Sequence, residues 1–496
     1  MMVDGQPGQV EVGRSADGQR STSALGRTVV TGALRDVDPV GARAAEQETN
    51  WRSGYLRHVR RLTEAGLDTP DAARAIAAGG LAAVHEQMGV VAGDDEPDAP
   101  LSSLRDAPAA RTLMTRMVVG SGEPETDLTI PYAGRELRGD DLRRQLDTWA
   151  RDGTVEPTVG DAIGQVLSNP QWLRLEGRTV VVLGAGAEIG PLPSLLRWGA
   201  TVAGVDLPQR GIWERLLATA HERAGTLLVP IDARRDLADD VEIAGYAGVD
   251  LTAEVPAAAD WVAGLDGAPV LGTYAYADGA AHVKVTVATD VLAQRVRGIR
   301  PDTALAFLAT PTDVFAVPAE AVEHSVAAYA DRSRTAKLLG RPLRTVSGGR
   351  LLKRNYVPGA DPGICDALVA QQGPNYALAK RIQRWRATHA RAEGTLVSLN
   401  VAPSTRTRSV LKNRVLAAAY AGAHRFGIEV FEPETTNALM AALLVHDLHT
   451  GGGPTQAAPW QQEAYAAAHG GLWRSAYAPR SALGLATVLG VGASRS

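Results

Sequence analysis

The sequence has almost no cysteine, no long apolar run and no excess of positive charge. Cys365 is the only cysteine in 496 residues, so an intramolecular disulfide is excluded and a reducing, cytoplasmic setting is expected. No window approaches the roughly 18–20 uninterrupted apolar residues of a membrane helix, and Met1–Gly13 lacks the basic and apolar stretches of a signal peptide. The net charge of -4 argues against nucleic-acid binding, which usually requires a basic face.

The length of the chain predicts more than one domain, because a single hydrophobic core rarely extends over so many residues. Residues 1–45 are rich in Gly, Asp, Ser and Gln and show no helical or strand period, so we expect them to be disordered. Residues 46–165 predict a mainly helical domain, with one helix starting at Thr69-Pro70. Residues 451–496 form a tail that would either pack on the core or bind a partner.

The segment from about 170 to 450 alternates β-rich apolar runs with helical stretches. This alternation predicts an α/β fold in which a doubly wound parallel sheet is covered by helices on both faces. The first strand, Thr179–Leu183, leads directly into the glycine-rich segment 184–190. A helix is expected next, followed by the strand Thr201–Val205, which ends at Asp206.

This order of elements predicts a Rossmann nucleotide-binding unit. Glycine lets the backbone approach a phosphate closely, the following helix offers free N–H groups, and Asp206 stands where a carboxylate can accept hydrogen bonds from ribose hydroxyls. Dinucleotide-dependent enzymes and S-adenosylmethionine-dependent methyltransferases share this layout, and the loop does not separate them. Glu188 lies within the loop and would repel a pyrophosphate unless its carboxylate points away.

A second motif, Tyr-x-x-x-Lys, is formed by Tyr376 and Lys380 within a helical stretch. Residues four apart lie one turn apart on the same helical face. A nearby ammonium favours tyrosinate and lowers the pKa of the phenol, which could then exchange a proton with a substrate oxygen near neutral pH. The alternative is a helix that merely exposes a tyrosine and a lysine.

With this motif the chain resembles the short-chain dehydrogenase/reductase family over roughly residues 175–450. Gly184 and Gly190 match the first and last glycines of the family's loop, whereas Glu188 stands in place of the middle one. Asp206 resembles the acid that selects NAD over NADP. The resemblance implies cofactor contacts from Gly184, Gly186, Ile189, Gly190, Asp206, Asp232, Lys380, Pro403 and Thr405.

The resemblance also implies catalytic roles. Tyr376 would be the general acid/base, and Lys380 would lower its pKa and hold the nicotinamide ribose. The family's serine has no match at its usual spacing; Thr310, or less directly Thr312, would replace it after the strand Thr303–Ala309. Lys284 stands where the family has an asparagine that holds a relay water.

A large insertion of about residues 313–375 separates that strand from the tyrosine. It contains basic residues among apolar ones, namely Arg341, Arg344, Arg350, Lys353 and Arg354. One interpretation is a solvated basic face. The other is a lid that closes over the substrate and binds an anionic group such as a carboxylate or phosphate.

The sequence therefore predicts an NAD(P)-dependent oxidoreductase that interconverts an alcohol and a carbonyl on a small molecule. NAD is the expected cofactor, and no metal is expected because His446 and His449 have no third ligand. A non-catalytic nucleotide-binding Rossmann protein and a methyltransferase are the alternatives. No nucleic-acid or membrane partner is expected, and a homo-oligomer is left open.

Overall fold

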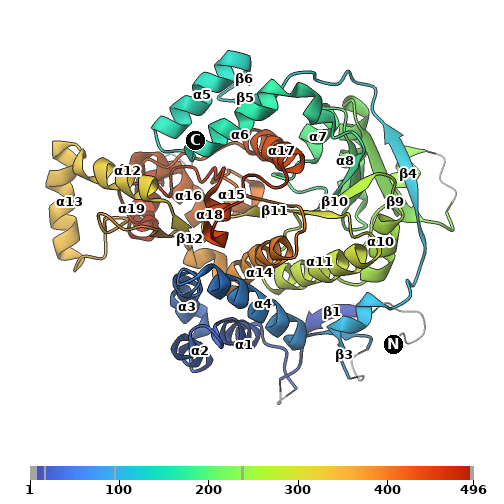
Figure 1. The fold of residues 1–496 in the computed structure, drawn as a ribbon, viewed down its shortest axis with the longest axis horizontal. Coiled ribbons are helices and arrows are strands. Elements are labelled where there is room, and N and C mark those ends of the chain that lie inside the picture. The colour runs from blue at the N-terminus through green and yellow to red at the C-terminus, as the bar shows by residue number, and fades with distance from the viewer. Residues whose placement is uncertain (1–7, 16–17, 94–96, 236–238, 492–496) are drawn as a thin grey trace.

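The computed structural model describes residues 8–15, 18–93, 97–235 and 239–491 (Figure 1). Its centre is a seven-stranded sheet in the order β14-β11-β10-β7-β8-β9-β4, in which β4 alone runs antiparallel. The strands are β14 (Val397–Val401), β11 (Ala304–Ala309), β10 (Ala268–Thr273), β7 (Arg178–Leu183), β8 (Thr201–Val205), β9 (Thr226–Asp232) and β4 (Leu113–Val119). The predicted α/β fold is confirmed, and the strand order reverses between β7 and β10, as in doubly wound dinucleotide-binding sheets.

Helices cover both faces of the sheet, which explains why its parallel strands are almost continuously apolar. One face packs against α10 (Val255–Ala263), α11 (Ala280–Ile299) and α14 (Gly373–Ala392). The other packs against α6 (Pro157–Ser168), α7 (Leu192–Arg197), α8 (Arg210–Glu222) and α17 (Pro433–Thr450). Helix α17 is buried nearly all round, from Thr435 to Leu448, as expected of a helix without a polar face.

The N-terminal segment differs from expectation. Disorder over residues 1–45 is wrong for the described part of that range, which contains β1 (Gln9–Val12), α1 (Thr22–Leu34) and α2 (Pro39–Glu46). Polar side chains mask a helical apolar period here: Leu25, Val29 and Leu34 are buried on one side of α1. Ser21 caps α1 by accepting a hydrogen bond from the N–H of Ala24.

Residues 46–165 are not a separate helical domain. Their helices are α3 (Trp51–Ala65), α4 (Pro70–Gln87), α5 (Gly139–Arg151) and α6, but β4 adds an edge strand to the central sheet. Helices α1 to α4 share one hydrophobic core with α11 and α14, and Figure 1 shows α4 lying beside α14. The smaller strands of this part are β2 (Met88–Val91), β3 (Ala99–Pro100), β5 (Thr129–Tyr132) and β6 (Arg135–Arg138).

The insertion folds as β12 (Val314–Val317), α12 (Ala319–Ala330), α13 (Arg334–Val346) and β13 (Gly363–Asp366), with β12 and β13 antiparallel. Helix α13 projects at the left of Figure 1, away from the sheet. The remaining helices are α9 (Asp240–Tyr246), α15 (Arg408–Lys412), α16 (Arg414–Ala423), α18 (Pro459–Ala464) and α19 (Pro479–Gly490), and α19 packs on α16. No helix in the described ranges is long and apolar enough to span a bilayer.

Candidate functional site

The glycine-rich loop follows β7 at the carboxyl edge of the sheet. Gly184 has φ +89°, and a Cβ at this position would lie 2.5 Å from the Cα of Ala275, in the segment after β10. Only glycine therefore fits, because a side chain would be both strained and in collision. The N–H of Gly186 donates to the Oδ2 atom of Asp206 at 2.8 Å, which joins the loop to the end of β8.

Asp206 lies where the sequence predicts a ribose-binding acid. It also accepts a hydrogen bond from the N–H of Leu207. Burial raises the pKa of Asp206 above its ordinary value, and the two backbone N–H groups partly oppose that effect. A desolvated carboxylate beside a glycine turn suits the ribose hydroxyls of an adenine nucleotide, so this part of the loop fits a dinucleotide.

Glu188 does not disturb that fit. Its carboxylate pairs with Arg408 at the start of α15, accepting from the Nε atom at 2.6 Å and from the backbone N–H at 2.8 Å. The charge inside the loop is therefore neutralised by Arg408. Beyond the loop, Asn437 of α17 donates to the carbonyl of Gly190, and Ile189 packs against the core on the α17 side.

Helix α7 is shorter than a phosphate-binding helix usually is. It has six residues, with Pro191 before it and Pro193 at its second position, and proline has no N–H to donate. Five loop residues, Gly184, Ala185, Gly186, Ala187 and Gly190, also use their N–H groups within the protein. The start of α7 thus offers a phosphate fewer free N–H donors than the sequence predicts.

The three other residues expected at the cofactor lie at the same edge of the sheet. Asp232 ends β9, where Arg234 donates to it at 2.7 and 2.9 Å and, with a backbone N–H, holds its pKa well below the usual range. Pro403 and Thr405 follow β14, and the Thr405 hydroxyl bonds to Pro403 O and to Thr436. The polar side chains of Asp232 and Thr405 are therefore already hydrogen-bonded within the protein.

The predicted catalytic residues come together two strands away from the loop. Thr310 follows β11 directly, and its hydroxyl lies beside the phenol of Tyr376 on α14, whose pKa it lowers. It also lies 2.8 Å from the hydroxyl of Thr312. Lys380, one turn after Tyr376, donates to Leu308 O and to Gln383 Oε1, both at 3.1 Å. The insertion between β11 and α14 loops out without separating these groups.

The electrostatics of this cluster differ from expectation. Burial raises the pKa of Tyr376 well above its ordinary value, and the Thr310 hydroxyl only partly opposes that effect. Burial lowers the pKa of Lys380 to about 8. Tyr376 is therefore a protonated phenol at neutral pH, which is the state of a general acid.

Two aromatic residues that the sequence did not single out pack beside the cluster. His282 of α11 lies 5.4 Å from Tyr376 between ring centroids, and Tyr276, after β10, lies 5.0 Å from His282. Lys284 does not take part, because its ammonium pairs with Glu11 of β1. Residues two apart on a helix face different directions, so His282 rather than Lys284 faces Tyr376.

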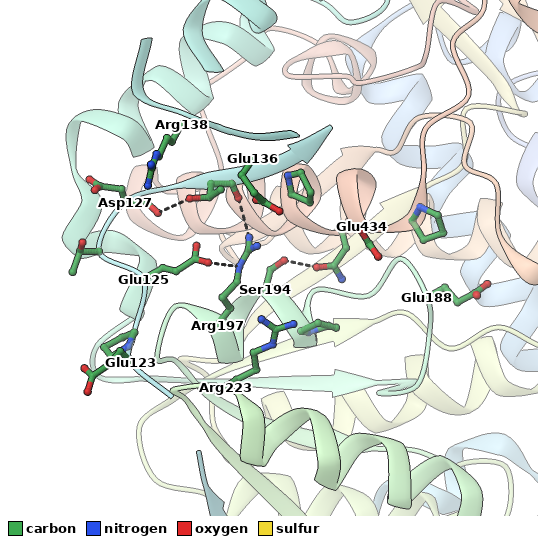
Figure 2. A pocket seen from close by; sticks show the side chains of 17 residues that line it. Glu123, Glu125, Asp127, Glu136, Arg138, Glu188, Ser194, Arg197, Arg223 and Glu434 are labelled. Atoms are coloured by element: carbon green, nitrogen blue, oxygen red, sulfur yellow. Dashed lines mark hydrogen bonds and ion pairs between the residues drawn. The ribbon is translucent and has the colours of Figure 1, made fainter. Parts of the chain in front are cut away.

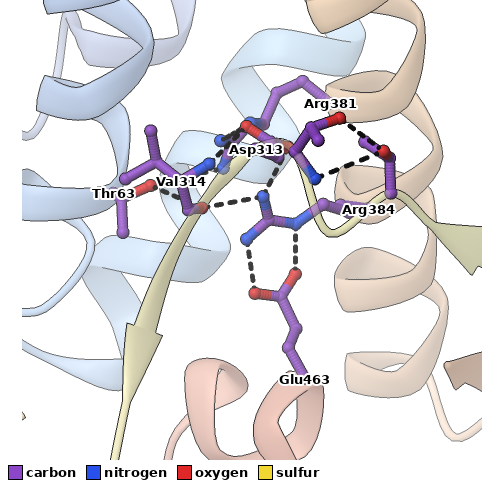
Figure 3. Close-up of polar contacts among 8 residues, drawn as sticks. Thr63, Asp313, Val314, Arg381, Arg384 and Glu463 are labelled. Carbon is purple, nitrogen blue, oxygen red and sulfur yellow. Dashed lines mark hydrogen bonds and ion pairs between the residues drawn. The ribbon is translucent and has the colours of Figure 1, made fainter. Parts of the chain in front are cut away.

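A buried ion network fixes α14 against the insertion and the tail (Figure 3). Arg384 binds Glu463 of α18 through two hydrogen bonds of 2.6 and 2.7 Å and binds Asp313 at 2.7 Å. Arg381, next to Lys380, also donates to Asp313 at 2.8 Å. Burial raises the pKa of Asp313, but the two guanidinium charges outweigh it and the pKa lies below the ordinary value. The network holds the tyrosine helix at a fixed position relative to the end of β11.

Two cavities lie near these elements. A small one, of about 50 Å³, extends from Thr312 between α16 and α19 and is walled by residues such as Ala419 and Leu472. The cavity wall includes Tyr420, which lies beside Ser404, and Arg480, which pairs with Asp366 at 2.9 Å. Most of the wall is aliphatic or aromatic, so the space beside Thr312 is apolar.

The larger cavity, of about 770 Å³, lies on the outer side of α7 and is lined by opposite charges (Figure 2). Its charged residues are Glu123, Glu125, Asp127, Glu136, Arg138, Glu188, Arg197, Arg223 and Glu434. Neither Tyr376 nor Lys380 contributes to its lining. Within the described ranges, no group of three or more His, Cys, Asp and Glu side chains could hold a metal ion.

The fold and site define a Rossmann-type α/β protein with a Thr-Tyr-Lys cluster. No family model and no curated protein matches the chain. Among solved structures it is similar to a thiolation-reductase di-domain from an archaeal non-ribosomal peptide synthetase, with 11% identity and a TM-score of 0.27. That match covers 53% of this chain and about half, 52%, of the other. The function is therefore argued from the residues of the site.

Proposed function

We propose that this protein is an NAD-dependent reductase of the short-chain dehydrogenase/reductase type, which converts a carbonyl group to an alcohol. The observation that carries this proposal is the cluster of Thr310, Tyr376 and Lys380 at the carboxyl end of β11. The glycine loop and Asp206 lie at the same edge, and two strand spacings, roughly 10 Å, separate β7 from β11. Ligands of open α/β sheets bind at this edge, where the strand order reverses.

The residues would divide the reaction as follows. A reduced nicotinamide cofactor, held by the glycine loop and Asp206, would supply the hydride for the carbonyl carbon. As the C=O π electrons move to oxygen, the Tyr376 hydroxyl gives that oxygen its proton, so an alcohol and a tyrosinate result. Thr310 orients the oxygen by hydrogen bonding, and Lys380, when charged, stabilises the tyrosinate. Reduction is the proposed direction because it is the one in which the protonated Tyr376 phenol donates its proton.

The apolar cavity beside Thr312 suggests the nature of the substrate. Two of the basic residues on which an anionic substrate was expected contact Tyr329 instead: Arg344 donates to its hydroxyl, and Arg354 stacks on its ring. The wall of the cavity offers mainly alkyl and aromatic surface to a ligand. We therefore propose a carbonyl compound with a small apolar substituent rather than an anionic one.

The reaction is tested by deuterium transfer. NADH with deuterium at C4 is incubated with a panel of small apolar aldehydes and ketones, and the alcohols are analysed by mass spectrometry. The expected result is deuterium on the carbinol carbon. Deuterium transfer at the same rate by a Tyr376→Phe variant would reject the proposed role of the cluster. NADH binding without transfer to any carbonyl would favour the non-catalytic nucleotide-binding alternative.

Asp206 predicts a preference for NADH over NADPH. Its partly buried carboxylate would accept hydrogen bonds from ribose hydroxyls but repel a 2′-phosphate. Calorimetric titration should therefore give a higher affinity for NADH than for NADPH. Asp206→Ser should reduce this difference, because the affinity for NADH falls and the affinity for NADPH rises. Equal or tighter NADPH binding by the unmodified protein would contradict the assignment.

The cavity predicts a size limit for the substrate. Ala419→Leu would fill part of the space beside Thr312, so KM should rise for carbonyl compounds with longer apolar chains, while NADH affinity stays the same. Ala417→Leu, on the same helix but outside the cavity lining, is the matched control. An equal effect of both variants on all substrates would show that the cavity does not hold the substrate.

A further inference from the structure

His282 is a buried imidazole whose polar atoms are unused. It is the third residue of α11, and its side chain is 1% exposed. Within the described part of the chain, neither Nδ1 nor Nε2 has a hydrogen-bond partner. Other buried histidines use at least one ring nitrogen: His469 Nε2 bonds to Glu156 at 3.0 Å and His446 Nδ1 to Asp447 at 3.0 Å. An unpaired buried polar atom costs about 1–3 kcal/mol, so we expect His282 to have a hydrogen-bond partner outside the described chain.

The surroundings of His282 make it a neutral group. Burial, and to a lesser degree the nearby charge of Lys380, lower its pKa to about 3. A neutral imidazole carries one N–H donor and one acceptor nitrogen. Its natural complement is a ligand that offers both an acceptor and a donor, such as a carboxamide or a sugar hydroxyl.

The position of His282 indicates which ligand that is. Helix α11 follows β10, which lies on the far side of the strand-order reversal from the glycine loop. A dinucleotide bound across such a reversal has its adenine half over the first set of strands and its other half over β10 and β11. His282 lies near the rings of Tyr376 and Tyr276 and the charge of Lys380. These residues lie on the β10 and β11 side of the sheet, where the second half of a dinucleotide would bind.

We propose that His282 binds the nicotinamide-ribose half of the dinucleotide through hydrogen bonds, as a neutral donor and acceptor beside Tyr376 and Lys380. This role rests on the proposed function. It assigns the imidazole to ligand binding, not to packing or to proton storage.

The test compares NADH with ADP, which has only the adenine half. Calorimetric titrations are made on the unmodified protein and on the His282→Leu and His282→Gln variants. His282→Leu should weaken NADH about tenfold and leave ADP unchanged, and His282→Gln should recover part of the loss. His389→Leu, a partly exposed histidine on α14, is the control and should bind both nucleotides normally.

Two further readouts separate binding from folding. The Tm of His282→Leu should equal or exceed that of the unmodified protein, because two unpaired polar atoms are removed. In ¹⁵N-histidine NMR spectra, the signal that is missing from His282→Leu identifies His282 among the ten histidines. The chemical shifts of that signal should indicate a neutral ring. They should change when NADH is added but not when ADP is added.

The outcomes distinguish this inference from the proposed function. If the unmodified protein binds NADH and His282→Leu binds it equally well, the role of His282 is rejected and the reductase proposal stands. If NADH and ADP weaken together, the effect is on the fold, and the inference is likewise rejected. If the unmodified protein binds neither NADH nor NADPH, both proposals fail.

Discussion

Tyr376→Phe is expected to lower kcat by about 10²–10⁴-fold, the usual contribution of a general acid, while the affinity for NADH remains unchanged. The variant removes only the hydroxyl beside Thr310 and leaves the aromatic ring in place. Single-turnover oxidation of NADH with a carbonyl substrate measures the rate, and calorimetry measures the affinity.

Tyr276→Phe provides the matched control. Its ring lies 6.2 Å from that of Tyr376, but its hydroxyl donates to Asp278 at 2.8 Å and not to Thr310. The control should keep most of the activity. If the two variants lost activity equally, the loss would not be specific to the Tyr376 phenol, and the general acid would have to be another group.

Arg384→Met is expected to destabilise the protein by about 3–5 kcal/mol, because it leaves the Glu463 carboxylate buried without its guanidinium partner. Asp313 keeps its ion pair with Arg381 but loses its ion pair with Arg384. Urea unfolding followed by circular dichroism gives the change in the free energy of unfolding.

Two comparisons make that test specific. Arg297→Met removes a partner of the partly exposed pair with Glu393, at 3.4 Å, and should cost no more than about 1 kcal/mol. The double variant Arg384→Met/Glu463→Leu removes both charges and should recover part of the loss. A loss below about 1 kcal/mol for Arg384→Met alone would show that the network does not fix α14.

Local sequence patterns predict much of the sheet. Thr201–Val205 is a strand with the bounds expected, and the strand expected at Thr179–Leu183 starts one residue earlier. Each is a short run of β-branched or apolar residues that ends at Gly or a polar residue. Such runs are typical of strands in a fully buried parallel sheet. Tyr376, Lys380 and Thr310 could be proposed because each follows from a motif or from the end of a strand.

Long-range pairing could not be predicted in the same way. Asp313, Arg384 and Glu463 are far apart in the chain, and nothing local indicates that they meet. The helix α1 was missed because its apolar period is diluted by polar and small residues. His282 was missed because its significance lies in burial without a partner, which only tertiary packing reveals.

The most direct test of the reductase proposal is a calorimetric titration of the unmodified protein with NADH and, separately, with S-adenosylmethionine. The two ligands separate the cofactor classes that share a glycine loop and a following acid. We expect saturable binding of one NADH per chain and no binding of S-adenosylmethionine. Binding of S-adenosylmethionine without binding of NADH or NADPH would contradict the account.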